Sequence, residues 1–301
     1  MRITRLPKVM RFVWRHPLSQ RRRLNRLHRF FAWQLGSRLV PGPVAVPFVN
    51  ETRLLVRPGM EAATGNIYVG LQEFHEMAFV LHALRPDDLF VDVGANVGTY
   101  TLLAASAVGC QCIAIEPVGQ TWATLIDNVE LNQARDRVET HCIAVGRTAG
   151  EARFTSSLKT CNRVATPDDD VRGRPTINVP IRPLDVVSND RRPTIIKIDV
   201  EGYEPEVIAG AQRTLERPDL LAVLMETNPH VARNGEALNS VNDEMRRLGF
   251  TPHRYDGLHR SFYPLKSAPG TLTNTVYARA LGVLTERCQT SPRYRVLDTD
   301  V

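Results

Sequence analysis

The sequence has no apolar run that approaches the roughly 18 residues needed to cross a membrane. The apolar stretch Leu220–Met225 has only the length of a strand. A convincing secretory signal is also missing, because arginines interrupt every apolar stretch near the N-terminus and no small-residue cleavage site follows them. We therefore expect a soluble protein of 301 residues with a full hydrophobic core.

Cysteine is scarce, and no C-x-x-C pair is present. The five residues are Cys110, Cys112, Cys142, Cys161 and Cys288. An odd number without paired spacing favours free thiols in a reducing cytoplasm over a disulfide framework. Cys110 and Cys112 flank the start of a predicted strand, where small buried residues are expected, so their spacing favours packing over metal binding.

Acidic residues are absent from residues 1–50. This segment carries eleven basic residues: Arg2, Arg5, Lys8, Arg11, Arg15, Arg21, Arg22, Arg23, Arg26, Arg29 and Arg38. The rest of the chain holds the other 27 of the 38 basic residues against all 32 acidic ones. The net charge of +6 therefore comes entirely from the N-terminus.

The spacing of this segment predicts an amphipathic basic helix. Its apolar residues Leu24, Leu27, Phe31 and Leu35 recur at helical intervals beside Arg22, Arg26 and Arg29. The apolar face could pack on a catalytic domain with the arginines in solvent, or lie on an anionic membrane or partner as a peripheral contact. Specific nucleic-acid binding is disfavoured because no recognition motif accompanies the arginines and the remaining chain is acidic.

Apolar and turn-forming segments then alternate. A short hairpin is expected over 44–49 and 53–56, followed by a helix over 70–84 that ends before Pro86. Strands are predicted at 89–93, 111–115, 138–143, 194–199, 220–226, 250–255 and 271–278, with helices at 98–108, 120–131, 204–215 and 236–248. Such alternation predicts an α/β fold with a mostly parallel sheet of seven strands, helices on both faces and an antiparallel last strand.

Three regions follow from this pattern. Residues 1–84 form an N-terminal helical and hairpin extension, 85–285 the main domain, and 286–301 a flexible tail. Within the main domain, residues 151–182 interrupt the alternation and are expected to form a hairpin with a mobile tip.

The segment Asp92–Gly98 carries the clearest chemical signal. It reads Asp-Val-Gly-Ala-Asn-Val-Gly, follows an apolar strand, and precedes a second strand that ends in Glu116. Glycines allow a sharp turn into a helix, and a carboxylate at the end of the next strand can accept hydrogen bonds from ribose hydroxyls. Dinucleotide folds use G-x-G-x-x-G to seat a pyrophosphate, whereas Asn96 stands at the second glycine position. An adenosine ligand without a pyrophosphate, S-adenosylmethionine, fits better.

Four blocks in this order make the pattern specific: Phe90–Thr101, Ile115–Pro117, Cys142–Gly146 and Lys197–Gly202. Together they resemble the FkbM-family methyltransferases over about residues 85–230. The resemblance implies a class I, Rossmann-like methyltransferase that transfers a methyl group from S-adenosylmethionine to a hydroxyl of a sugar, glycolipid or polyketide. The acceptor would then be a small molecule or a lipid-linked glycan.

The cofactor is expected beyond the carboxyl ends of the strands. Its predicted contacts are Asp92, Gly94, Asn96, Gly98, Glu116 and Ala144. The backbone amides of residues 94–98 would hold the methionine part, with a further contact from the Asn96 side chain, and Glu116 would take the ribose.

Asp199, Glu201 and His230 are the candidate catalytic residues. Asp199 and Glu201 follow a strand and lie two positions apart, so they should share a face near the acceptor. A carboxylate could take the proton that an alcohol loses. Glu201 could instead cap the following helix or pair with an arginine. His230 and His75 are candidate bases by position only.

No metal is expected, although Asp199, Glu226 and Asn228 would offer oxygen ligands suited to Mg²⁺. Two other functions stay open. One is an NAD(P)-dependent oxidoreductase, disfavoured by the missing glycine. The other is a non-catalytic module that binds membrane or nucleic acid, disfavoured by the near-complete motif set. The sequence predicts nothing about oligomeric state.

Overall fold

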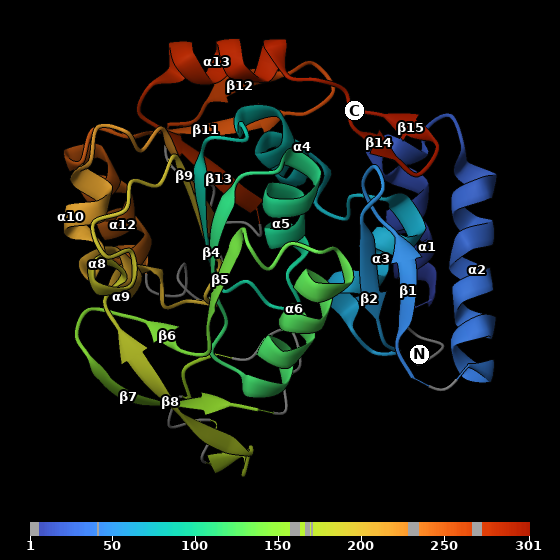
Figure 1. Ribbon diagram of the computed structural model, residues 1–301, viewed down its shortest axis with the longest axis horizontal. Helices are drawn as coiled ribbons and strands as arrows, with labels where there is room; N and C mark the ends of the chain where they lie inside the picture. The colour runs from blue at the N-terminus through green and yellow to red at the C-terminus, as the bar shows by residue number, and fades with distance from the viewer. Residues whose placement is uncertain are drawn as a thin grey trace.

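The computed structural model describes residues 6–40, 42–156, 163–165, 169, 171–227, 235–266 and 273–301. In this part of the chain a large mixed sheet lies between two layers of helices, and an N-terminal unit packs beside them (Figure 1). No helix among these residues is long and apolar enough to cross a membrane.

Eight strands of the described chain form the central sheet, in the order β12-β11-β13-β10-β9-β3-β4-β5. They span Leu89–Val93 (β3), Gln111–Ile115 (β4), Val138–His141 (β5), Ile195–Ile198 (β9), Ala222–Thr227 (β10), Thr251–Asp256 (β11), Ser261–Pro264 (β12) and Thr273–Ala278 (β13). The seven predicted strands are all present, and β13 is antiparallel to both β10 and β11. The eighth strand, β12, extends the edge by pairing antiparallel with β11.

Alternation along the strands produces two hydrophobic layers. Phe90 of β3 and Ala114 of β4 belong to one buried cluster, whereas their neighbours Val91 and Ile113 belong to another. Successive side chains of a strand point to opposite faces, so both faces need helical cover. The helices of the first face are Phe74–Ala83 (α4), Thr99–Leu102 (α5), Gly119–Leu131 (α6) and Leu281–Thr290 (α13). Those of the second are Leu184–Val187 (α8), Glu204–Ala209 (α9), Gln212–Glu216 (α10) and Gly235–Arg247 (α12). The predicted class I methyltransferase arrangement is confirmed.

Two predicted helices are less regular than expected. After α5, residues Leu103–Val108 form a π-helical segment (η3) that ends at Gly109. The helix expected over 204–215 is divided into α9 and α10 around Gly210. A Cβ at Gly210 would lie 2.0 Å from the carbonyl oxygen of Gly146, so only glycine permits the close approach of these two segments.

The inserted segment forms a second, smaller sheet. Gly150–Thr155 (β7) pairs antiparallel with Thr176–Arg182 (β8), and Ala144–Val145 (β6) pairs parallel with β8. The expected hairpin is thus confirmed. Most of its tip, for which mobility was predicted, lies outside the described residues.

The N-terminal unit consists of Leu6–Arg15 (α1), Pro17–Ser19 (η2), Arg23–Leu39 (α2), the hairpin Val44–Pro47 (β1) and Arg53–Val56 (β2), and Glu61–Val69 (α3). The hairpin is fixed to α6, because the backbone N–H of Leu55 donates to Asn128 Oδ1 over 2.7 Å. Val13, Phe30 and Phe48 belong to the same buried cluster as the first face of the central sheet. The unit is therefore continuous with the main core.

The interpretation of α2 with solvated arginines and a packed apolar face holds for Arg22, which is exposed, and for Leu27, which packs against the core, but it is wrong for the other residues that it named. Arg26 is completely buried and forms an ion pair with Asp298, while the side chain of Arg29 donates to the carbonyl oxygen of Ile67 over 2.8 Å. Leu24, Phe31 and Leu35 are exposed. Arg26 and Arg29 point inward because the C-terminus and α3 offer them acceptors.

The prediction of a flexible tail over 286–301 is also wrong. Helix α13 extends to Thr290, and Arg295–Val296 (β14) then pairs with Thr299–Asp300 (β15). Val296 forms an isolated bridge with Val49, and the backbone N–H of Asn50 donates to the carbonyl oxygen of Arg295 over 2.7 Å. Figure 1 shows β14 and β15 beside the N-terminal unit. These residues are ordered because the N-terminal unit supplies their backbone and charge partners.

Candidate cofactor and methyl-transfer site

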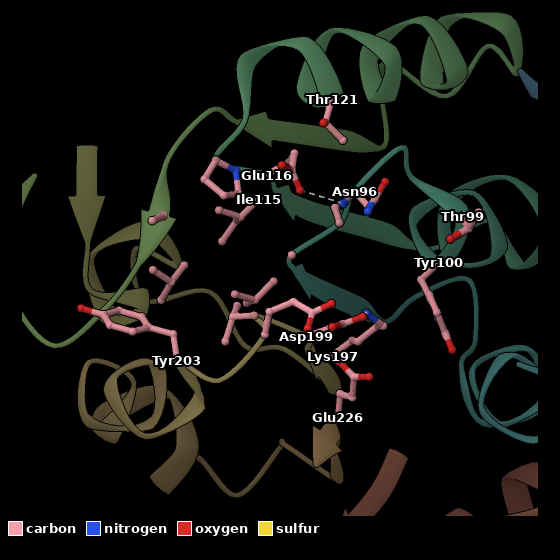
Figure 2. Close-up of a pocket in the computed structure, with 18 of the residues that line it drawn as sticks. Asn96, Thr99, Tyr100, Ile115, Glu116, Thr121, Lys197, Asp199, Tyr203 and Glu226 are labelled. Atoms are coloured by element: carbon pink, nitrogen blue, oxygen red, sulfur yellow. Dashed lines mark hydrogen bonds and ion pairs between the residues drawn. The ribbon is translucent and has the colours of Figure 1, made fainter. Parts of the chain in front are cut away.

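A cavity of about 320 Å³ opens at the carboxyl ends of β3, β4, β9 and β10. Its wall also includes residues from the segment before α4, from α6, from β6 and from β7. Figure 2 shows Glu116 and Asn96 on one side of the cavity, and Lys197, Asp199 and Glu226 on the other. The predicted position of the site, at the edge where the parallel strands end, is therefore the position of this cavity.

The glycine loop is pressed against the end of β9. Gly94 has a φ of +80°, and a Cβ there would lie 1.9 Å from the carbonyl oxygen of Asp199. Only a residue without a side chain accommodates both the backbone angle and the contact. Gly94 thereby allows the loop after β3 and the turn after β9 to lie in direct contact.

Each backbone N–H of the loop already donates within the protein. The N–H groups of Gly94 and Ala95 both donate to the carbonyl oxygen of Ile115 over 2.9 Å. Those of Asn96, Val97 and Gly98 donate to Glu116 Oε2, Asn96 Oδ1 and the carbonyl oxygen of Ala95. The expectation that these amides hold the methionine part of the cofactor stays a prediction, and such contacts would have to be shared with, or replace, these internal partners. The same arrangement leaves no cluster of amide donors for a pyrophosphate.

Glu116 joins the loop to the second strand. Its Oε2 accepts the N–H of Asn96 at 3.0 Å, shown as a dashed line in Figure 2, and its Oε1 accepts the N–H of Val118 at 2.9 Å. Burial raises the pKa of Glu116 to about 7, against the lowering effect of these two backbone donors. Each carboxylate oxygen has a second lone pair, so Glu116 can still accept hydrogen bonds from a diol in the cavity.

The other predicted cofactor residues divide into two groups. Gly94, Asn96 and Ala144 contribute to the cavity wall with Glu116. Asp92 and Gly98 do not line it. Asp92 is completely buried, and its Oδ2 accepts a hydrogen bond from the Thr101 hydroxyl over 2.7 Å. A Cβ at Gly98 would lie 2.5 Å from Leu125 Cδ1. Both support the loop from behind, Asp92 through its contact with α5 and Gly98 through its close approach to α6.

Lys197 is the charged centre of the opposite wall. It is almost completely buried and lies opposite Asp92 in the register of β3 and β9. Its Nζ donates to Asp199 Oδ2 over 2.8 Å. The ammonium also lies 4.7 Å from the ring centroid of Tyr100. Burial acts to lower the pKa of Lys197, but Asp199, Asp92 and Glu73 outweigh it and raise the pKa above its ordinary value. Lys197 is therefore a permanent cation in the wall.

Asp199 and Glu226 have opposite protonation preferences. Burial acts to raise the pKa of Asp199, yet Lys197 and a hydrogen bond from Glu226 hold it below the usual range. Burial, the charge of Asp199 and that hydrogen bond raise the pKa of Glu226 well above the usual range. At neutral pH the pair thus consists of an ionised Asp199 and a protonated Glu226.

Glu201 completes a group of three carboxylates. It lies beyond the end of β9 with a φ of +54°, and its side chain still approaches Asp199 and Glu226, one oxygen of each residue lying within 4.8 Å of the others. The prediction that Asp199 and Glu201 share one side is confirmed, although a turn rather than strand alternation produces it. This oxygen set could hold a divalent cation. Lys197 and the proton of Glu226 already offset part of its negative charge.

Sequence reasoning missed the contribution of Glu73 and Tyr100 to this wall. The Tyr100 hydroxyl donates to Glu73 Oε2 over 2.6 Å, and burial is the main cause that raises the pKa of Glu73. Glu73 precedes α4 and is distant in sequence from the motifs. One signal was available: a lysine inside the apolar run Ile195–Ile198 must find acidic or aromatic partners when that strand is buried.

The two candidate histidines have different outcomes. His75 does not line the cavity, and its Nδ1 instead accepts the backbone N–H of Gly257 over 3.1 Å. The suggestion that His75 acts as the base is therefore wrong. His230 and Asn228 lie outside the described residues.

The fold and this site define a class I methyltransferase, with the buried carboxyl group of Glu116 opposite the ionised Asp199 in one cavity. A family model described as the methyltransferase FkbM domain matches residues 92–252, more than half of the chain. The protein belongs to the FkbM methyltransferase family, and its cofactor is S-adenosylmethionine. This assignment, with the saturated loop amides, stands against the NAD(P)-dependent oxidoreductase alternative.

Similar proteins include one curated enzyme and several solved structures. Hexuronic acid methyltransferase AglP of Haloferax volcanii is 27% identical over 146 residues, which cover 48% of this chain and 58% of that protein. The chain thus matches less than two thirds of that relative. TYW2 of P. horikoshii in complex with MeSAdo covers 79% of this chain and 70% of its own, at 15% identity and a TM-score of 0.43. A SAM-dependent methyltransferase from Agrobacterium tumefaciens covers 80% and 71%, at 11% identity and a TM-score of 0.40.

Proposed function

We propose that the protein is an O-methyltransferase whose acceptor is a hydroxyl of a sugar or of a sugar-bearing small molecule or lipid. The observation that carries this proposal is the ionised Asp199 in the cavity wall, held by Lys197 over 2.8 Å. An alcohol becomes a good nucleophile only as its proton leaves, so an O-methyltransferase benefits from a carboxylate at this point. The relative named as a hexuronic acid methyltransferase supports a carbohydrate acceptor.

The cofactor would lie across the cavity with its ribose on Glu116. The side chains of Asn96 and Ala144 in the same wall would border the adenosine, and the methionine part would extend toward Asp199 and Tyr100. Because the loop amides are already satisfied, side chains of this opposite wall would bind the amino-acid group. When bound, S-adenosylmethionine supplies a methyl group on a positively charged sulfur.

Asp199 would accept the proton of the acceptor hydroxyl as the oxygen bonds to the methyl carbon and the carbon–sulfur bond breaks, its electron pair remaining on sulfur. Lys197 keeps Asp199 ionised before the reaction, and Glu201 would orient the acceptor through its adjacent carboxylate. In-line transfer depends chiefly on holding the three reacting atoms in a line, which fixed wall residues can do. His230 remains a predicted alternative base.

The proposal is tested by incubating the protein with methyl-labelled S-adenosylmethionine and a panel of uronic acids, neutral glycans, glycolipids and polyketides. We expect label in a carbohydrate product that survives mild alkali, as a methyl ether does and a methyl ester does not. Transfer only to nitrogen, or only to a carboxylate, would contradict O-methylation of a hydroxyl.

Two variants assign the base. Asp199→Asn should retain binding of S-adenosylhomocysteine but lose transfer by about 100-fold or more, within the range of general-base contributions. His230→Ala should retain transfer if Asp199 is the base. Loss of transfer in His230→Ala, with transfer retained in Asp199→Asn, would assign the base to His230.

Adding EDTA to the wild-type assay tests whether the three-carboxylate group needs a metal ion, and unchanged turnover is expected.

A further inference from the structure

Helix α2 presents an apolar stripe to solvent. The stripe consists of Leu24, Phe31, Leu35 and Leu39, which are 78%, 44%, 63% and 81% exposed. Their spacing places them along one side of the helix. In Figure 1, α2 lies at the outer edge of the molecule, with the rest of the N-terminal unit between it and the central sheet.

The opposite side of α2 accounts for its packing. Phe30 is completely buried and lies with its ring centroid 5.1 Å from that of Tyr68 on α3. Arg26 is paired with Asp298, and Gln34 donates to the hydroxyl of Tyr68 over 3.1 Å. The inner side of α2 thus attaches this helix to the rest of the fold. Of the outer stripe, Phe31 touches this attachment through an edge contact with Phe30, their ring centroids 5.2 Å apart. A row of exposed apolar side chains on one side of a helix points to an external partner.

Basic side chains accompany the stripe. On α1, Lys8, Arg11 and Arg15 are exposed and lie at helical spacing around a shallow depression that also includes Phe12. Arg23 of α2 places its guanidinium 5.0 Å from the ring centroid of the half-exposed Trp14 of α1, which connects the two exposed surfaces. Residues 1–50 contain no acidic side chain that could offset this charge.

We infer that the outer face of α1 and α2 binds the surface of an anionic lipid bilayer. The stripe and Trp14 would enter the boundary between headgroups and acyl chains, and the lysine and arginines would contact lipid phosphates. A second copy of the chain is a poorer partner, because a two-fold contact would place this basic face against itself. This inference goes beyond the methyl-transfer reaction and does not depend on the identity of the acceptor.

The surface is connected to the site through α3. Helix α2 packs on α3, and the segment after α3 carries Gln72 and Glu73 into the cavity wall. The backbone N–H of Gln72 donates to Asn66 Oδ1 of α3 over 2.7 Å. Bilayer binding would therefore hold the enzyme through an element adjoining the cavity.

The test is co-sedimentation of the full chain with phosphatidylcholine vesicles that contain or lack phosphatidylglycerol. We expect binding to anionic vesicles at least about tenfold stronger than to neutral ones, and weakened by salt, because several basic residues contribute. The triple variant Leu24→Ser, Leu35→Ser, Leu39→Ser should lose binding. So should Lys8→Gln, Arg11→Gln, Arg15→Gln.

The matched control is Leu258→Ser with Val283→Ser, which removes exposed apolar side chains elsewhere. It should bind like the wild type, and all variants should melt within a few degrees of it because the changed residues are exposed. Equal binding by the stripe variant and the wild type would overturn the inference. The inference would also be overturned if the wild type were a dimer and the triple leucine variant a monomer, or if the protein bound RNA but not the vesicles. Vesicle binding without methyl transfer would leave this inference standing and contradict only the proposed function.

Discussion

The buried ammonium of Lys197 lies 2.8 Å from Asp199 Oδ2, at the point where β9 passes into the turn that carries Glu201. The positive charge of this lysine thereby acts on three carboxyl groups: Asp199 at the end of β9, Asp92 of β3, and Glu73 in the segment before α4. It keeps Asp199 ionised within a wall that also contains the protonated Glu226. The reactivity of the site therefore depends on a residue that need not touch the cofactor.

Lys197→Met should destabilise the protein by about 3 to 5 kcal/mol, because it leaves buried carboxylates without their cation. Urea unfolding at about pH 8, where ordinary carboxylates are ionised, measures the change. The matched control is Arg192→Met, whose exposed guanidinium pairs with Asp219 over 3.3 Å. It should change the free energy of unfolding by less than about 1 kcal/mol. Similar losses in both variants would contradict the role of Lys197.

At about pH 8, where Glu116 with its pKa of about 7 is mostly ionised, Glu116→Gln should weaken binding of S-adenosylhomocysteine by roughly 10- to 100-fold. Hydrogen bonds to a charged acceptor contribute about 1.5 to 3 kcal/mol. Isothermal titration calorimetry measures the affinity. Glu130→Gln, on the exposed side of α6 where Glu130 pairs with Arg135, is the matched control and should bind like the wild type. Unchanged affinity in Glu116→Gln would contradict the ribose assignment.

The same substitution should change how stability depends on pH. The folded pKa of Glu116, about 7, exceeds the ordinary value of 4.5, so the folded state binds this proton more tightly. Its contribution to stability is fully present below about pH 4.5 and is lost as the pH rises to about 7. The wild type should therefore lose up to roughly 3 kcal/mol more than Glu116→Gln across this interval. If the free energy of unfolding, measured by urea titration at several pH values, changed with pH equally in the two proteins, the pKa of Glu116 would not be raised in the folded state.

Asp298→Ala should destabilise the protein by about 3 kcal/mol, because Arg26 would remain buried without its carboxylate partner. Thermal or urea unfolding measures the loss. The control is Asp300→Ala, two residues along the same turn, where Asp300 pairs with an exposed Arg295 over 3.1 Å. That change should cost less than about 1 kcal/mol. An equal effect of the two substitutions would indicate that the C-terminus is not held through Arg26.

Gly94→Ala should destabilise the protein by about 3 kcal/mol or more and weaken cofactor binding. The new Cβ would meet the carbonyl oxygen of Asp199 at a position whose φ already disfavours a side chain. Gly150→Ala is the control, since no atom lies within 4 Å of the Cβ it would introduce. Its effect on unfolding should stay within about 1 kcal/mol. A stable Gly94→Ala variant with normal affinity would contradict the close packing of the loop.

The main sheet was predictable because its strands are short apolar runs separated by turns. Helix α3 was not predicted, since Gly65 and Asn66 interrupt its pattern. In the fold, Gly65 leaves room for the Gln72 side chain, since a Cβ there would lie 2.0 Å from Gln72 Oε1. The C-terminal residues were expected to be flexible because their partners, Arg26 and Val49, lie at the far end of the sequence.

The sequence by itself determined the family, the cofactor and the sheet edge that carries both Glu116 and Asp199, because local motifs encode strand ends and tight turns. Only the tertiary structure decided that the loop amides are internally satisfied, that Asp92 and Gly98 lie behind the cavity wall, and that α2 turns Arg26 and Arg29 inward. Those outcomes depend on which donors and acceptors from distant segments come within hydrogen-bond distance. Spacing along the chain does not contain that information, since burial and pairing are set by packing in three dimensions.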